Sequence, residues 1–174
     1  MKTLLRGGGL LVRLGGAAEA RLVQVLRPAA MPSLRILLGV LFMWFGALKV
    51  AGVSPVAAMV AGTLPWADPH MAVPVLGGVE VLLGTAAVTG VGLRLALPVL
   101  AAHLCGTFLT FVMLPGLMFV QGDPLLLTED GEFVMKNLVL IGATLALIAH
   151  APARSRSRGL GRRLPTPSRA AIQE

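Results

Sequence analysis

Cysteine, tyrosine and tryptophan are scarce in this chain of 174 residues. The single cysteine, Cys105, lies inside an apolar run, so no disulfide can form within the chain and no cysteine pair is available for zinc or dithiol exchange. Tyrosine is absent and tryptophan occurs twice, which leaves little material for an aromatic belt. No phosphate-binding glycine loop, nucleophile elbow or set of His, Cys and carboxylate residues at metal-ligand spacing is present. The sequence therefore predicts no metal or haem, and no cofactor is evident from motifs.

Charged residues are also few, at 13% of the chain, whereas hydrophobic residues make up 56% and the mean hydropathy is +0.83. A soluble domain of this length has too little interior to bury so much apolar surface, whereas a bilayer lets apolar side chains face lipid. The net charge of +7 is compatible with nucleic-acid binding, but the basic residues gather near the two ends of the chain. That distribution is typical of membrane proteins. We expect a protein whose partner is the lipid bilayer, with no nucleic-acid partner.

Four apolar stretches are long enough to cross about 30 Å of hydrocarbon at about 1.5 Å per residue. They occupy residues 34–53, 71–93, 95–120 and 133–150. A glycine-rich turn joins the second and third stretches, which predicts an antiparallel helix pair, and Pro115 is expected to kink or end the third. The predicted fold class is all-α, a polytopic membrane four-helix bundle.

Lysine and arginine outside these spans fall on one side of the predicted membrane. They precede the first span, occur at Arg94 between the second and third, or follow the fourth, and the other two loops carry none. The positive-inside rule places that side in the cytoplasm. The expected location is therefore a bacterial inner membrane, with four spans, both termini cytoplasmic and residues 54–70 and 121–131 outside.

Three further segments surround or connect the spans, which occupy a domain of residues 31–150. Residues 1–30 predict a basic amphipathic helix on the cytoplasmic leaflet. Residues 151–174, rich in Arg, Ser and Pro, predict a disordered basic cytoplasmic tail. In the first outer loop, Ser54 as a cap followed by Pro55 predicts a short helix over residues 56–64. The apolar face of the N-terminal helix is expected to carry Leu11, Leu14, Ala18, Leu22 and Val25.

Ionisable residues inside the spans are the candidates for function, because such groups are costly in lipid and usually face a bundle interior. They are Lys49, Glu80, His103 and Lys136. Helix rise places Glu80 roughly 13 Å from the outer end of its span, with both lysines nearer that end and within side-chain reach. Glycines share the faces that carry Lys49 and Glu80, which predicts a close helix interface there. If both lysines meet Glu80, one positive charge is left over.

Polar residues extend this group on the last two spans. His103, Thr107 and Thr110 form a stripe at helical spacing, and Asn137 adjoins Lys136. Such a pocket suits a small oxyanion or the polar head of a quinone, and no catalytic residue is assigned. The alternatives are a structural salt bridge at Glu80, lysines that act as interfacial anchors, and a hydrogen-bonded interior histidine. The candidate ligand-binding residues are Lys49, Glu80, His103, Lys136 and Asn137.

Four segments resemble DoxX-like membrane proteins, closest to the YkgB or reactive-chlorine-resistance-protein-C type. They are RILLGVLFMWFGALK at 35–49, GGVEVLLG at 77–84, TFLTF at 107–111 and GEFVMKNL at 131–138. One departure is Asn137, where the family pattern leads us to expect an acid. The resemblance implies a four-helix inner-membrane fold and a link to redox or oxidative (reactive chlorine) stress. The wider superfamily includes a subunit of a thiosulfate:quinone oxidoreductase, so a non-catalytic membrane subunit with redox partner subunits is one expectation.

Three functions follow from these observations. The first is a redox-associated membrane protein that binds a quinone head or small oxyanion in an outward-open polar pocket. The second is a small-solute transporter, and the third is a structural or assembly subunit whose polar cluster only specifies helix packing. A cavity that reaches Glu80 favours the first two, whereas a dry, closed ion pair favours the third.

The predicted orientation is testable with single cysteines in a Cys105→Ala background. Cysteines placed at Asp68 or Asp123 should react with an impermeant maleimide in intact cells, because both positions lie in the loops without basic residues. A cysteine placed at Arg94 should be protected until the cells are opened. Labelling at position 94 in intact cells would show that the orientation is opposite to the predicted one.

Overall fold

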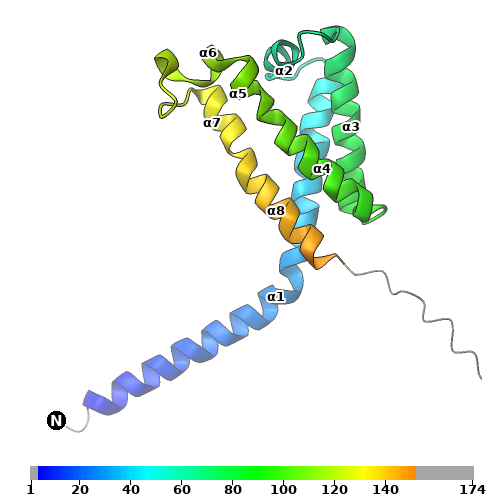
Figure 1. Ribbon diagram of the computed structural model, residues 1–174. Coiled ribbons are helices and arrows are strands. Elements are labelled where there is room, and N and C mark those ends of the chain that lie inside the picture. Colours follow the sequence, from blue (N-terminus) through cyan, green and yellow to red (C-terminus); the bar gives the residue numbers. More distant parts are fainter. Residues whose placement is uncertain (1–3, 152–174) are drawn as a thin grey trace, which may run out of the picture.

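The computed structural model describes the backbone of residues 4–151 and the side chains of Gly16 and residues 19–151. This part of the chain is helical, without a named strand, and Figure 1 shows the helices packed as a bundle with one long N-terminal extension. The tail predicted over 151–174 lies outside the described residues from position 152 onward. The helices are α1 (Leu4–Val50), α2 (Ala57–Thr63), α3 (Pro69–Thr89), α4 (Leu93–Thr107), α5 (Leu109–Met113), α6 (Pro115–Met118), α7 (Glu129–Met135) and α8 (Asn137–His150).

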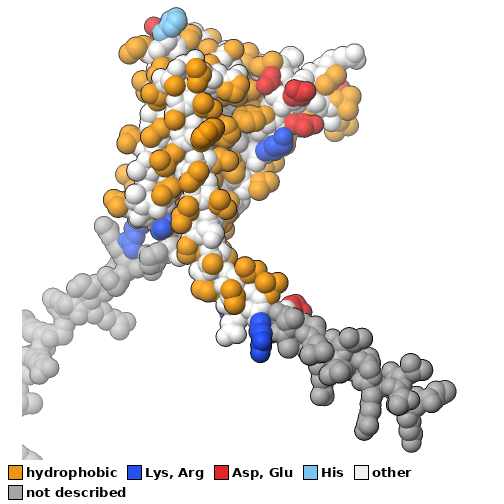
Figure 2. All heavy atoms as spheres, turned by 180° about the vertical axis from the view of Figure 1, so that it is seen from behind, with side chains coloured by type: hydrophobic (Ala, Val, Ile, Leu, Met, Phe, Trp, Pro, Cys, Tyr) orange, Lys and Arg blue, Asp and Glu red, His pale blue; other side chains and the backbone are white. Residues whose placement is uncertain are grey.

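Four helical stretches of the described chain are long and apolar enough to cross a membrane. They are Glu19–Val50, Pro69–Thr89, Leu93–Met113 and Glu129–His150. Their outer faces carry exposed apolar side chains such as Leu82, Val112 and Val139, and Figure 2 shows hydrophobic side chains over the sides of the bundle. A surface of this kind is stable in contact with lipid and not with water. The predicted all-α four-helix membrane bundle is confirmed.

The N-terminal segment is helical as expected, but it is not a separate helix. α1 runs without interruption from Leu4 through Pro28 and Pro32 to Val50, and Figure 1 shows that it changes direction partway. A proline inside a helix removes a backbone donor and crowds the preceding turn, which bends the helix without ending it here. Leu22 and Val25 are exposed, whereas the side chains of Leu11, Leu14 and Ala18 lie outside the described residues.

Two pairs of glycines hold α1 close to α3. Gly39 lies against Gly84, and Gly46 lies against Gly77, with the pairs about two turns apart on each antiparallel helix. A Cβ atom at Gly46 would stand 2.5 Å from the carbonyl oxygen of Gly77, and a Cβ atom at Gly77 would stand 2.6 Å from that of Gly46. The backbones therefore touch directly, as small residues allow in membrane helices.

One end of the bundle is closed by the turn between α3 and α4. Gly90 caps α3 with φ of 83°, and Gly92 precedes α4 with φ of 67°, values that favour glycine. Near this end, the side chains of α4 pack against α1, α3 and α8 to form the main apolar core. That core contains the buried residues Leu38, Phe42, Leu83, Ala96, Leu97, Leu100, Leu104 and Leu147.

The opposite end, called here the α2 end, is covered by short helices. Met59 of α2 packs with Met118 of α6 and Val134 of α7, so α2 lies over the bundle as predicted. The predicted Ser54 cap is wrong: α2 begins only at Ala57, and its cap residue Val56 makes no side-chain hydrogen bond. Residues 54–57 form a turn instead, closed by the bond from the Ala57 N–H to the Ser54 carbonyl.

The last two spans also differ from their predicted bounds. The third span stops at Met113, because Pro115 starts a separate short helix after Leu114. The fourth begins at Glu129 because the Thr128 hydroxyl accepts a hydrogen bond from the Gly131 N–H at 3.1 Å. Acidic residues occupy the first turn of α7, where the helix dipole favours them.

Adjacent glycines on α3 offer a matched test of the α1–α3 contact. Gly77→Ala should lower the thermal midpoint in detergent or nanodiscs, because the added methyl group overlaps α1 at a cost of about 1–3 kcal/mol. Gly78→Ala should leave the midpoint unchanged or raise it, because nothing lies within 4 Å of that position and alanine favours helix. Equal behaviour of the two variants would contradict the glycine contact.

Candidate functional site

A buried ion pair joins α1 to α3 beside the Gly46–Gly77 contact. The Lys49 Nζ lies 2.6 Å from Oε2 of Glu80, and each residue is 5% exposed. Gly77 lies about one turn before Glu80 and faces the Cβ of Lys49, while Gly46 lies about one turn before Lys49 and faces the Cβ of Glu80. Each glycine thus makes room for the charged side chain of the other helix. The predicted pairing of Glu80 with Lys49 is confirmed.

The second oxygen of Glu80 contacts His103 on α4. Nε2 of His103 lies 3.0 Å from Oε1 of Glu80, and the ring stands edge-on to Phe42 with centroids 5.9 Å apart. An ionised carboxylate only accepts hydrogen bonds, so Nε2 must carry a proton when Glu80 is charged, whether or not the ring as a whole is charged. Glu80 therefore holds three helices together through donors on both of its oxygens.

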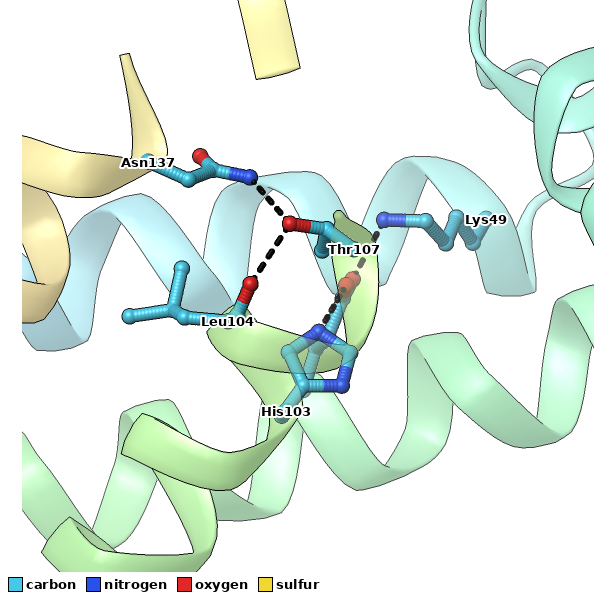
Figure 3. A network of polar contacts seen from close by, with 6 residues as sticks. Lys49, His103, Leu104, Thr107 and Asn137 are labelled. Carbon is cyan, nitrogen blue, oxygen red and sulfur yellow. Dashed lines mark hydrogen bonds and ion pairs between the residues drawn. The ribbon is translucent and has the colours of Figure 1, made fainter. Parts of the chain in front are cut away.

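A chain of polar side chains continues from α4 to α8. The Asn137 amide donates to the Thr107 hydroxyl at 2.8 Å, and that hydroxyl donates to the Leu104 carbonyl at 2.6 Å (Figure 3). Thr110 lies farther toward the α2 end, with the hydroxyl of Thr63 3.2 Å from its own. Polar side chains thus come from α1, α2, α3, α4, α5 and α8 within one region of the bundle.

Lys136, the fifth predicted site residue, lies outside this group. Lys136 is exposed and does not border the cavity that the other four candidates line. The described ion pairs of Glu80 are those with Lys49 and His103. The expectation that both lysines meet Glu80 is therefore wrong. Successive helical residues point about 100° apart, so when Asn137 faces the interior its neighbour Lys136 cannot.

The polar residues lie along the wall of an internal cavity of about 340 Å³. Lys49, Glu80, His103 and Asn137 border it together with Thr63, Thr107 and Thr110. The rest of the lining is apolar apart from Gly106, and includes Phe42, Phe45, Leu76, Val134 and Leu140. A largely apolar cavity with a few convergent polar groups is the usual form of a small-molecule site. Among the described residues, no group of three or more His, Cys, Asp or Glu side chains is placed to hold a metal ion.

Sequence reasoning missed the contribution of α2. Thr63 is 7% exposed, and its hydroxyl also donates to the Met59 carbonyl at 2.8 Å. A single threonine at the end of a short apolar loop helix carries no periodic signal, because the loop has no second polar residue at helical spacing. Only the folding of α2 over the bundle brings it to the cavity.

No protein-family model, curated protein sequence or solved structure matches this chain.

The pairing within the site can be measured with a double-mutant cycle in detergent or nanodiscs. Glu80→Gln should lower the unfolding free energy by on the order of 3 kcal/mol, because it leaves the Lys49 charge buried without its counter-ion. Lys49→Met combined with Glu80→Gln should lose less than the sum of the two single changes.

Lys136→Met supplies the control for this cycle. Because Lys136 is exposed and outside the cluster, its effect should add to that of Glu80→Gln. Additive losses for the Lys49 pair, or a coupling for Lys136 as large as that for Lys49, would contradict the arrangement of charges described above.

Proposed function

We propose that this chain is a DoxX-like protein of the bacterial inner membrane that binds the polar head of a quinone and serves redox or reactive-chlorine stress tolerance. The observation that carries the proposal is the cavity whose wall holds the Lys49–Glu80–His103 group on one side and Asn137 on the other. Sequence resemblance supports the cellular context, and the distribution of loop charges supports an orientation with the α2 end outside and both termini in the cytoplasm.

Donors toward the cavity match the carbonyl oxygens of a quinone. An ammonium group has three hydrogens, and the described contacts of Lys49 use one, with Glu80. An amide nitrogen has two, and Asn137 uses one with Thr107. Two donors on different helices, α1 and α8, therefore border one apolar space. A ring with two carbonyl oxygens can accept from both.

The charge of the site favours a quinone over a small oxyanion. Lys49 and Glu80 cancel, so with a neutral His103 ring the group carries no net charge. The positive charge that an oxyanion requires was expected from Lys136, which lies outside the cavity. An anion placed among Phe42, Leu76 and Val134 loses its hydration without gaining a free counter-ion. A neutral, largely apolar ring pays no such cost.

The cavity also distinguishes ligand binding from a purely structural role. A polar cluster that only specifies helix packing is stable when the space around it is filled. Here, Glu80 and His103 border about 340 Å³ of open space, which is within the range of small-molecule pockets. In the proposal, the chain is the membrane-embedded quinone-binding member of a redox system, with redox partner subunits outside the described chain.

The test compares Asn137→Leu with Lys136→Met. Protein purified from cells should carry quinone that mass spectrometry detects after extraction, and Asn137→Leu should reduce the quinone-to-protein ratio several-fold, because it removes one donor. The change should leave the fold intact, since the Thr107 hydroxyl keeps its bond to the Leu104 carbonyl. Lys136→Met should keep the wild-type ratio.

The same variants test the cellular role. A deletion strain should be more sensitive to hypochlorite, and wild-type protein or Lys136→Met should restore tolerance while Asn137→Leu should not, at equal protein levels. Absence of quinone from the wild-type protein would remove the ligand assignment. Normal tolerance in the deletion strain would remove the stress assignment and leave the ligand assignment standing.

A further inference from the structure

The cavity has closed walls on most of its sides. The α1–α3 side is shut by the backbone contact of their glycines, and the α4–α8 side by the apolar packing of these two helices, next to which Asn137 donates to Thr107. Between α1 and α7, Phe133 lines the cavity and is 38% exposed, but its ring stands edge to face with that of Phe45, with centroids 6.0 Å apart, so the two rings occupy this side. The α2 helix covers the end that faces away from the α3–α4 turn.

The remaining side lies between α3 and the α4–α5 segment. These two segments meet at the Gly90–Gly92 turn and diverge toward the α2 end, where α2 contacts both α3 and α5 (Figure 1). Leu76 borders the cavity from α3, and Gly106 and Leu109 border it from α4 and α5. Leu109 is 37% exposed, Gly106 is exposed and Leu76 is half-buried. These residues line the cavity and also reach the outer surface, and no ring contact between α3 and α5 like that between Phe45 and Phe133 is described. The cavity therefore opens on this side.

The opening is apolar and lies within the depth of the membrane. A Cβ atom at Gly106 would meet no atom within 4 Å, so the space beside it is unfilled. Gly106 stands roughly 10 Å inside the Leu93–Met113 span from its α2 end, at about 1.5 Å per residue. The residues at the opening are uncharged and mostly apolar. They are Leu76, Gly106 and Leu109, with the neighbouring cavity-lining residues Val60 and Leu64 of α2. An opening of this kind faces acyl chains and not water.

We infer that the cavity opens sideways to the lipid through a slot between α3 and α5, bordered by Leu76, Gly106 and Leu109. The ligand then enters from within the bilayer, and a hydrocarbon tail attached to its head lies in the slot. This inference rests on the proposed quinone site and narrows its ligand to a membrane-dissolved quinone with an apolar tail. Tail carbons that leave lipid for the slot gain contact with apolar side chains on both borders.

Two quinones that differ only in the tail test the slot. The probes are a radiolabelled tailless dimethoxy-methyl-benzoquinone and the same ring with a decyl tail. Binding is measured on captured nanodiscs with and without the protein, as a function of the mole fraction of quinone in lipid. On this scale, the different partitioning of the two probes from water into lipid does not affect the comparison. The tailed probe should bind several-fold more tightly, because side chains that fit the tail closely offer it more dispersion contacts than the looser lipid around it.

Gly106→Trp should abolish this tail advantage by filling the slot, so that the tailed and tailless probes bind with equal affinity. Gly142→Trp is the matched control: position 142 on α8 also has nothing within 4 Å and does not border the cavity, so the tail advantage should persist. If Gly106→Trp misfolds or also fails to bind the tailless probe, Leu109→Trp takes its place. Leu109 lies about one helical turn farther along the chain from His103 than Gly106 does.

The results distinguish the lateral opening from the quinone site itself. Loss of the tail advantage in the slot variant with retention in Gly142→Trp supports lateral opening. Equal affinity of the two probes for wild type, or an undiminished tail advantage in the slot variant, overturns the slot while the quinone site stands. Failure of both probes to bind wild-type protein removes the quinone site, and the slot inference with it.

Discussion

The carboxylate of Glu80 imposes a requirement on the rest of the bundle. A negative charge at this depth in a hydrocarbon layer is tolerated only with donors that replace its water, and each oxygen must find one. Lys49 reaches one oxygen from α1, and His103 reaches the other from α4. Because the donors come from two different helices, satisfying one side chain fixes the relative positions of three. The glycine contact between α1 and α3 brings the two helices together beside this pair, in which Lys49 Nζ and Glu80 Oε2 lie 2.6 Å apart.

Tight packing on one side of the bundle leaves open space on another. α1 and α3 are held together by two glycine pairs. In contrast, α3 and α4 are joined at a short turn and through Glu80 and His103, and they separate toward the α2 end. Leucines of α4 fill the narrow part near the turn, and no side chains fill the wide part, which becomes the cavity. The polar groups stand where the narrow and wide parts meet. This position lets the same side chains hold the helices together and face a ligand.

The short α2 helix covers the wide end of the bundle and does not itself cross the membrane. Its seven residues contribute Met59 to the small apolar cluster with Met118 and Val134, and Thr63 to the polar side of the cavity. With this cover in place, water from the α2 end is kept from Glu80 and His103, which are 7% and 12% exposed at their side chains. In such surroundings, electrostatic interactions and hydrogen bonds with a ligand are stronger than in water.

The sequence alone determined the fold class and the number of spans, because hydropathy, helix rise and proline positions are local properties. Glycines at helical spacing also marked the faces on which Lys49 and Glu80 lie, although the sequence offered both Lys49 and Lys136 as partners of Glu80. Tertiary structure alone decided that His103 is the other partner and that Lys136 is not. Both lysines stand nearer than Glu80 to the α2 ends of their spans, so position along the span alone does not select the partner. The rotation of each helix about its own axis does, and packing against the other helices fixes that rotation. The place of Thr63 and the opening beside Gly106 likewise depend on how separate helices meet, which no single stretch of sequence records.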